Sequence, residues 1–268
     1  MNAFPRLDAA TRQKFIDADA ALVGKPLNPA ENCVPALQAN ARHMALMLLD
    51  DPSPARAREV AAFAESLIDA SLAAAVTEPI ACAKGCGHCC VTYVSCTFPE
   101  IFRLAEGVRG RADAEARVRD ASARAQSIPQ VYREVNRVIC PILVDSACSA
   151  YAHRPVVCRA VLSLSLPKCL AIFRDGLRVD FAHATGTEAI RGYAVIMLRA
   201  ALIVAGLPHQ NYEMTHALDI ALRDETAEAR WLAGEPVFAG VAVDRADIAD
   251  SHFYQLAEAL ASVVRQTI

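Results

Sequence analysis

The chain of 268 residues carries no marked excess of charge of either sign. Its formal net charge is −3, its sequence pI is about 6.2, and acidic and basic residues are mixed along its length. Proteins that bind DNA, RNA or anionic membranes present a basic patch or stripe. The sequence therefore gives no electrostatic reason to expect nucleic acid or a membrane surface as a partner.

No hydrophobic run is long enough to cross a membrane, and no secretory signal opens the chain. The most apolar stretch, residues 194–207, contains Arg199 and falls short of the roughly 20 residues that a bilayer span needs. Residues 1–10 contain Pro5 and lack a continuous apolar core. We expect residues 194–207 to form a buried helix and the protein to be cytoplasmic.

Several catalytic signatures are also missing. The sequence has no Ser/His/Asp set, no paired-carboxylate motif and no strand followed by a glycine-rich turn of the dinucleotide-binding type. It shows no internal repeat and no low-complexity linker. Hydrophobic residues make up 54% and charged residues 21%, which is typical of a globular chain and not of a disordered one.

Helical patterns cover most of the chain. Apolar residues recur at helical spacing, and prolines and glycines separate the segments. The helices we expect cover residues 11–23, 34–49, 55–76, 97–106, 111–126, 187–205, 212–233 and 247–267. Few strands are expected: residues 91–96 and 179–181 are the short candidates.

Local end signals support these boundaries. Ser53 and Pro54 predict the start of the third helix, with Ser as N-cap and Pro at the first helical position. Thr97 and Glu100 fit a capping box. Gly206 and Gly234 stand where a helix commonly ends.

The predicted fold is therefore mainly α, a helical body with an irregular cysteine-rich segment. Residues 1–79 form an N-terminal helical region, residues 80–165 the cysteine region and residues 166–268 a C-terminal helical region. We expect the three regions to form one compact unit.

Cysteine is abundant, with ten in the chain. In a reducing compartment such cysteines are more naturally metal ligands or reactive thiols than a disulfide framework. Seven fall into two groups, Cys82-x3-Cys86-x2-Cys89-Cys90 and Cys140-x7-Cys148-x9-Cys158. Thiolate is a soft ligand that selects zinc, copper(I) or iron–sulfur centres, and Gly85 and Gly87 allow the tight turns that bring close sulfurs together. The pattern predicts a metal site, with a redox disulfide as the main competing interpretation.

Two positions bear on the kind of site. Pro155 predicts the first turn of a helix, which would place Cys158 near the positive end of the helix dipole and favour its thiolate. Cys89 and Cys90 are adjacent in the sequence. Two adjacent cysteines rarely bind the same tetrahedral metal ion, because the side chains of neighbouring residues point apart. If both are ligands we expect two or more metals or a cluster; otherwise one ligates and the other packs nearby.

The other candidates are weaker. Cys33 stands alone in a helical stretch and is expected to be a small buried hydrophobe, whereas Cys96 and Cys169 stay open between burial and ligation. His88 and His153 are expected to be neighbours of the site. Asp145 and Glu100 would supply oxygen ligands only to iron or a mixed site.

The segments Ala81–Cys90, Pro99-Glu100, Cys140-Pro-x-Leu and Arg154-Pro-x-x-Cys158-Arg159 resemble the YkgJ family, a CxxCxxCC family described as zinc- or iron-chelating. The resemblance covers about residues 80–165. It implies as metal ligands Cys82, Cys86, Cys89, Cys90, Cys140, Cys148 and Cys158. It also makes Arg154 and Arg159 candidates for neutralising thiolate charge, the alternative being ordinary salt-bridging arginines.

The family is distantly similar to flagellin lysine N-methylases, for which an iron–sulfur cluster is proposed. The spacing of the first three cysteines also coincides with the radical SAM motif, but the few strand candidates do not suit a parallel barrel. We expect a metal-binding protein holding iron, as an iron–sulfur cluster, or zinc. The alternatives are an enzyme that uses the cluster for protein-lysine N-methylation or another redox or radical modification, with a protein substrate, and a helical interaction protein that the metal staples.

Overall fold

A computed structural model describes residues 7–83, 85–129, 132, 138–177, 179–244 and 252–268. The structure is 57% helical with 4% strand, which confirms the mainly α fold. No helix in the described residues is long and apolar enough to cross a membrane.

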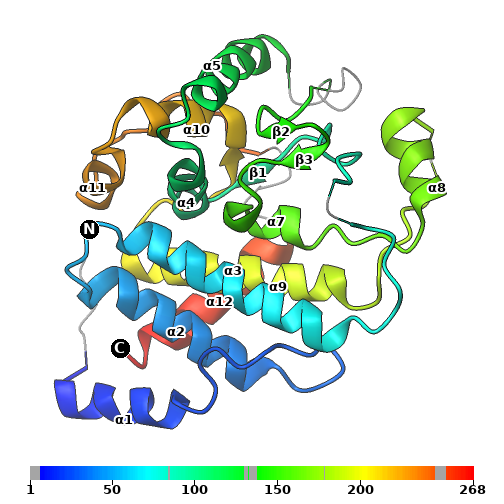
Figure 1. Ribbon diagram of the computed structural model, residues 1–268. Coiled ribbons are helices and arrows are strands. Elements are labelled where there is room, and N and C mark those ends of the chain that lie inside the picture. Colours follow the sequence, from blue (N-terminus) through cyan, green and yellow to red (C-terminus); the bar gives the residue numbers. More distant parts are fainter. Residues whose placement is uncertain (1–6, 84, 130–131, 133–137, 178, 245–251) are drawn as a thin grey trace.

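One group of helices forms the lower half of the molecule in Figure 1. Its members are α1 (Ala9–Asp19), α2 (Val34–Asp50), α3 (Arg56–Ala75), α9 (Thr187–Ala205) and α12 (His252–Arg265). The central helix is α9, which packs against α2, α3 and α12. This explains why its sequence is the most apolar of the chain: Ile190, Met197 and Leu202 are fully buried, and a helix covered on several sides needs apolar residues around most of its circumference.

A second group lies above the first and consists of α4 (Phe98–Val108), α5 (Ala112–Ser127), α10 (Met214–Arg223) and α11 (Ala227–Leu232). Helix α10 packs on α4 and α5, and α4 also contacts α3, so α4 connects the two groups. Phe98 at the start of α4 stacks on Tyr212 and on Phe238, with ring centroids 3.9 and 4.0 Å apart.

In the part of the chain that the structure describes, the strands form two antiparallel pairs of two residues each. β1 (Ser95–Cys96) pairs with β4 (Tyr212–Glu213), and β2 (Leu143–Val144) pairs with β3 (Ala147–Cys148). The β1–β4 pair joins the segment after the first cysteine group to the start of α10, whereas β2–β3 is a local hairpin that carries Cys148. Strand pairing therefore serves here to place loops.

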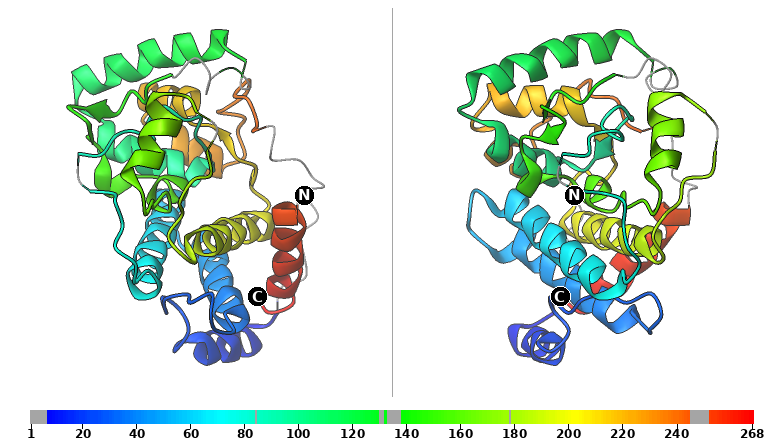
Figure 2. Two further views of the ribbon diagram at one scale, coloured as in Figure 1. Left: turned by 90° about the vertical axis from the view of Figure 1, so that its right-hand side faces the viewer. Right: turned by 45° about the vertical axis from the view of Figure 1, so that its right-hand side comes forward.

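Short helical turns connect the cysteine segments to the body. They are η1 (Tyr151–His153), α7 (Val156–Arg159), α8 (Leu166–Cys169) and η2 (Leu170–Arg174). Helix α7 contacts α3 and α9, and η1 contacts α4. Figure 1 shows α7 where the two helix groups meet, and the right-hand view of Figure 2 shows α8 at the edge of the molecule.

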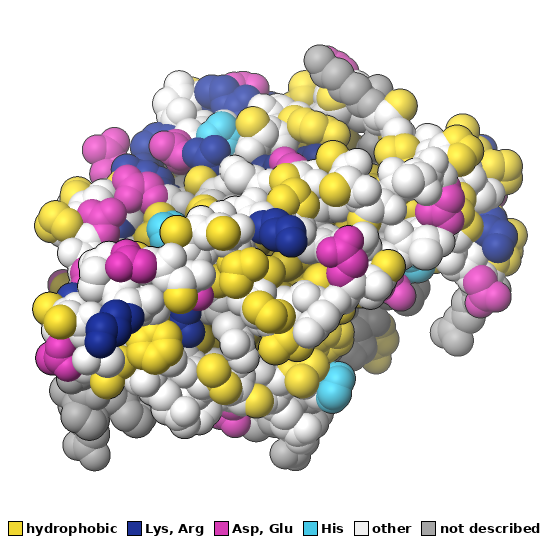
Figure 3. Space-filling view, turned by 90° about the horizontal axis from the view of Figure 1, so that it is seen from below, with side chains coloured by type: hydrophobic (Ala, Val, Ile, Leu, Met, Phe, Trp, Pro, Cys, Tyr) yellow, Lys and Arg dark blue, Asp and Glu magenta, His cyan; other side chains and the backbone are white. Residues whose placement is uncertain are grey.

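One hydrophobic core runs through the molecule. Its buried residues extend from Leu27 to Ile268 and include members from all three sequence regions, such as Ile68, Ile142 and Leu218. The face seen in Figure 3 mixes apolar side chains with charges of both signs and shows no continuous basic stripe.

Several sequence expectations need correction. Helix α3 begins at Arg56, after Ala55, because the Ser53 hydroxyl accepts a hydrogen bond from the amide of Ala55 in the turn before the helix. Gly107 lies inside α4, which extends past it to Val108.

The C-terminal elements differ further. The expected helix 212–233 is divided into β4, α10 and α11, since Tyr212 and Glu213 pair with β1 and Asp224 ends α10 in an extended conformation. Residues 179–181 form no strand; the nearby bridge joins Ser163 and His183. The first residues of the expected helix 247–267 lie outside the described residues, and α12 covers the rest.

Candidate metal centre

All seven candidate cysteines line two adjoining cavities. The first, of about 280 Å³, is lined by Cys86, Cys89, Cys90, Cys140, Cys148 and Cys158. The second, of about 210 Å³, is lined by Cys82, Cys86, Cys89, Cys158 and Cys169. Three of these cysteines belong to both cavities, so sulfur atoms from distant parts of the chain share one region of the protein.

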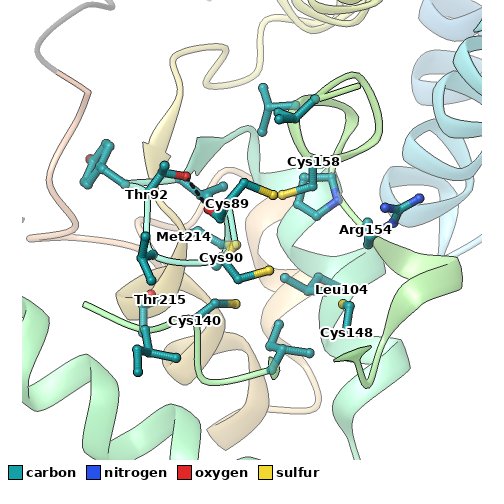
Figure 4. A pocket seen from close by; sticks show the side chains of 18 of the residues that line it. Cys89, Cys90, Thr92, Leu104, Cys140, Cys148, Arg154, Cys158, Met214 and Thr215 are labelled. Atoms are coloured by element: carbon teal, nitrogen blue, oxygen red, sulfur yellow. Dashed lines mark hydrogen bonds between the residues drawn. The ribbon is translucent and has the colours of Figure 1, made fainter. Parts of the chain in front are cut away.

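Figure 4 shows how the thiols of the first cavity lie. Cys89 and Cys158 point toward one another, and Cys90, Cys140 and Cys148 surround the same space. All of these cysteines are free thiols. In the described residues no three His, Cys, Asp or Glu side chains are arranged to hold a metal ion. The thiols therefore share walls without converging on one point, and holding a metal would require them to turn inward.

Glycine brings the first cysteine segment against the second. A Cβ atom at Gly87 would lie 2.7 Å from Cδ1 of Leu143 and 3.1 Å from the carbonyl oxygen of Ser146, so glycine at this position allows close approach to the β2–β3 hairpin. The amide of Cys140 donates a 2.8 Å hydrogen bond to the carbonyl oxygen of Cys90. These contacts explain the proximity of two groups that lie about 50 residues apart in the sequence.

Backbone amides favour the thiolate form of several sulfurs. The amide of Ser163 donates to Sγ of Cys82 over 3.3 Å. Burial raises the pKa of Cys140 to about 11, and hydrogen bonds from the backbone of Ile142 and Leu143 oppose this rise. Burial also raises the pKa of Cys148, against a backbone hydrogen bond from Ala150. Hydrogen bonds to the charged form stabilise it, and N–H groups aimed at sulfur are a recognised way to tune thiolate-bound metals.

The sequence predicted that the Cys158 thiol has a lowered pKa, and this prediction was wrong. Helix α7 does begin after Pro155, but it has only four residues, so its dipole is small. Burial raises the pKa of the Cys158 thiol, and the neighbouring thiols of Cys140 and Cys89 raise it further. The cost of removing water from the thiolate therefore raises the pKa more than the N-terminus of the helix lowers it.

The two arginines have different roles. The guanidinium of Arg159 is buried between helices and pairs with Glu65, at 2.9 Å, and with Asp69. Arg154 lines both cavities, and its guanidinium carbon lies 3.5 Å from the centroid of the Tyr151 ring.

Of these two arginines, Arg154 is the one whose charge lies beside the cavities. It lowers the pKa of Cys89, Cys148 and Cys158 against the larger effects that raise them. For Cys89 the largest is a hydrogen bond with Cys90, and for Cys148 and Cys158 it is burial.

Of the three remaining cysteines, Cys169 lines a cavity, whereas Cys33 and Cys96 do not. Cys33 is buried at the start of α2 and its thiol lies 2.9 Å from the carbonyl oxygen of Asn28. Cys96 is 1% exposed in β1 and lines neither cavity. Cys169 lines the second cavity, and its charge would raise the pKa of Cys82. No spacing in the sequence indicates this, because a separate segment carries Cys169.

The candidates without sulfur lie mostly outside the cavities. His88 lines the second cavity, whereas His153 packs its ring against Gly107 of α4. Asp145 is in the β2–β3 turn with a φ of 48°. Glu100 lines neither cavity, and both of its oxygens accept hydrogen bonds from the protein.

Comparison with known proteins adds no relative. No family model matches the chain, and no significant match is found among curated proteins or solved structures. The functional assignment depends on the cysteine pattern and on the geometry of the two cavities.

Proposed function

We propose that this chain is a cytoplasmic metal-binding protein that holds an iron–sulfur cluster, or alternatively zinc, through a multi-cysteine site. The proposed ligands come from Cys82, Cys86, Cys89, Cys90, Cys140, Cys148 and Cys158. One observation carries the proposal: all seven line two adjoining cavities, although they come from three separate stretches of the chain.

The chemistry of the donors supports a soft metal. Thiolates prefer zinc, copper(I) and iron–sulfur centres over magnesium or calcium. Backbone amides directed at Cys82 and Cys140, together with the cation Arg154, stabilise negative charge on sulfur. Binding a metal replaces the proton on each buried thiol and so removes the penalty that raises its pKa.

Iron is favoured over a single zinc ion. Six cysteines line the first cavity, among them the adjacent pair Cys89 and Cys90, and one tetrahedral zinc takes only four ligands. A polynuclear centre uses more of these sulfurs. An iron–sulfur cluster would supply electron transfer or a Lewis-acidic iron at this position.

An enzyme is the second candidate. Beyond its thiols the first cavity is lined by apolar side chains that include Val94, Leu104 and Met214. Space of this kind beside a metal site is typical of a small-molecule or side-chain pocket. The enzyme would use the cluster for protein-lysine N-methylation or another redox or radical modification.

The deciding experiment combines elemental analysis, acid-labile sulfide assay and a UV–visible spectrum on anaerobically purified protein. We expect iron and sulfide in matching amounts and a brown protein with charge-transfer absorption near about 400 nm. A colourless protein with stoichiometric zinc would select the zinc form. A protein that retains neither metal, and takes up neither on reconstitution, would refute the proposal.

Substitutions test the ligand set. Cys86→Ser and Cys89→Ser should each remove most of the bound metal, because both side chains line both cavities. Cys33→Ser is the matched control and should leave the metal content unchanged, since Cys33 lies just before the first residue of α2, outside both cavities. Unchanged metal in both of the first two variants would rule out this ligand set.

A further inference from the structure

The buried carboxylate of Glu100 joins the starts of two helices. Its Oε2 accepts hydrogen bonds of 2.8 Å from the amide and from the hydroxyl of Thr97, which completes the capping box of α4. Its Oε1 accepts a 2.9 Å hydrogen bond from the amide of Val156, 56 residues later in the chain. Glu100 is 4% exposed, so these bonds form out of contact with solvent.

Helix α7 has no cap of its own. Its N-cap residue is Pro155, which makes no side-chain hydrogen bond to the helix. The first amides of a helix lack partners within the helix, and a buried amide without a partner is costly. Glu100 supplies the missing acceptor from α4, as a capping side chain does at the start of a helix.

The turn that Glu100 holds carries two residues that line the cavities. Arg154 lies just before α7 and Cys158 lies within it, and both line both cavities. On the other side, Arg159 of α7 is anchored to Glu65 of α3. The turn is thus attached to two core helices, through one carboxylate on each.

We propose that Glu100 is a positioning residue of the cysteine site, which holds α7 so that Cys158 faces the cavities. Glu100 itself is no ligand, since its oxygens are engaged by Thr97 and Val156. This inference rests on the proposed function only for its metal readout.

Two variants break the link from opposite ends. Val156→Pro removes the donating N–H and leaves Glu100 and the α4 cap intact, and proline is tolerated at a first helical position. Glu100→Gln replaces one accepting oxygen by a donating NH2 group. Because Thr97 presents two donors and Val156 only one, the remaining oxygen stays with Thr97, and the NH2 group faces the amide of Val156, which loses its bond. Thr97→Val is the matched control, because it removes only the hydroxyl that belongs to the α4 cap and keeps the bond from Glu100 to Val156.

The first readout needs no metal. In metal-free protein, the alkylation rates of Cys158 and Cys33 by iodoacetamide are measured by mass spectrometry. In the Val156→Pro and Glu100→Gln variants we expect Cys158 to react about tenfold faster or more while Cys33 keeps its rate. Global loss of the fold would accelerate both cysteines alike, which would overturn a specific positioning role, as would a wild-type Cys158 rate in both variants.

The second readout is metal retention against a competing chelator. Both link-breaking variants should bind the metal about 10- to 100-fold more weakly, as for other residues that orient ligands, while Thr97→Val should retain wild-type affinity. If Thr97→Val weakened metal binding equally, Glu100 would act only through the cap of α4, and the inference would be overturned. If the wild type holds no metal, the proposed function fails, and the alkylation rates still decide whether Glu100 positions Cys158.

Discussion

Burial controls the ionisation of the side chains around the cysteine site. It raises the pKa of Cys140, Cys148 and Cys158 and of the carboxyl groups Glu65 and Glu100. In each case neighbouring donors or arginines oppose the effect without cancelling it. Burial thus favours the protonated form of the Cys140, Cys148 and Cys158 thiols, and binding of a soft cation would replace these protons.

Arg154→Gln tests the cation beside the thiols. Loss of this charge should raise the pKa of Cys148 further, so alkylation of Cys148 at constant pH should slow by about threefold, equivalent to roughly half a pKa unit. Rates are measured on metal-free protein by mass spectrometry. Arg119→Gln removes the same charge from an exposed position of α5 and should leave the rate unchanged; the same slowing in that control would exclude a local effect.

Glu65 makes stability depend on pH. Burial raises its pKa to about 7, against the opposing charges of Arg159 and Arg103, from the ordinary 4.5. Between these values the folded state binds more protons than the unfolded state, so the free energy of unfolding should fall as the pH rises from 4.5 to 7. The loss attributable to Glu65 amounts to about 3 kcal/mol at most.

The measurement is urea unfolding at pH 5 and pH 7.5 for wild type and Glu65→Gln. Glutamine does not titrate, so the variant should lose less stability over this interval than the wild type does. Identical pH dependence in the two proteins would show that Glu65 is ionised throughout.

At the scale of elements, short segments are held by close contacts with α3 and α4. Helix α4 carries the Glu100 carboxylate at its start and packs Gly107, near its end, against η1. Helix α3 holds Arg159 through Glu65. The cysteine-bearing turns thus depend on rigid helices, which is how a site assembled from loops acquires a defined geometry.

Gly107→Ala tests the contact between α4 and η1. In an exposed helix this change would stabilise by about 1 kcal/mol, but here the new Cβ would lie 2.7 Å from Cγ and Nδ1 of His153. Overpacking of this kind costs about 1 to 3 kcal/mol, so we expect net destabilisation in urea unfolding. Combining it with His153→Ala should recover the loss; a more stable Gly107→Ala protein would contradict the contact.

At the scale of the whole molecule, the cavities unite segments that different parts of the core support. Backbone hydrogen bonds join the first cysteine segment to the chain around the other cysteines. The amide of Cys140, before the β2–β3 hairpin, donates to Cys90, and the amide of Ala81 donates to Ser163, beyond α7. A metal bound there would link these segments directly, and a ligand that binds only the folded state stabilises it.

Removal of the metal should therefore lower the melting temperature by several degrees. Thermal unfolding is recorded before and after treatment with a chelator, and again after reconstitution, which should restore the original value. Cys33→Ser should respond as the wild type does, whereas Cys89→Ser should already melt at the lower temperature and be insensitive to the chelator. A metal-loaded wild type that melts unchanged after chelation would show that the metal does not join the segments.

Periodicity and end signals determined much of the fold from the sequence alone. Helix α9 has the bounds that its pattern predicts, and the capping box of Thr97 and Glu100 forms with both reciprocal bonds. Such features depend on residues within a few positions of one another, so a local pattern is sufficient to predict them. The spacing of the seven cysteines predicted that they bind a metal together, and this stays a prediction, although all seven line the two adjoining cavities.

Only the tertiary structure decided which partners each side chain has and how deeply it is buried. It turned Arg159 toward α3 and left Arg154 at the cavities, reversed the expected pKa shift of Cys158, placed Cys169 in the second cavity and gave Glu100 its bond to Val156. Each outcome depends on burial and on partners tens of residues away in the chain. Desolvation and packing direction arise only when distant segments meet, and for that reason no local pattern contains them.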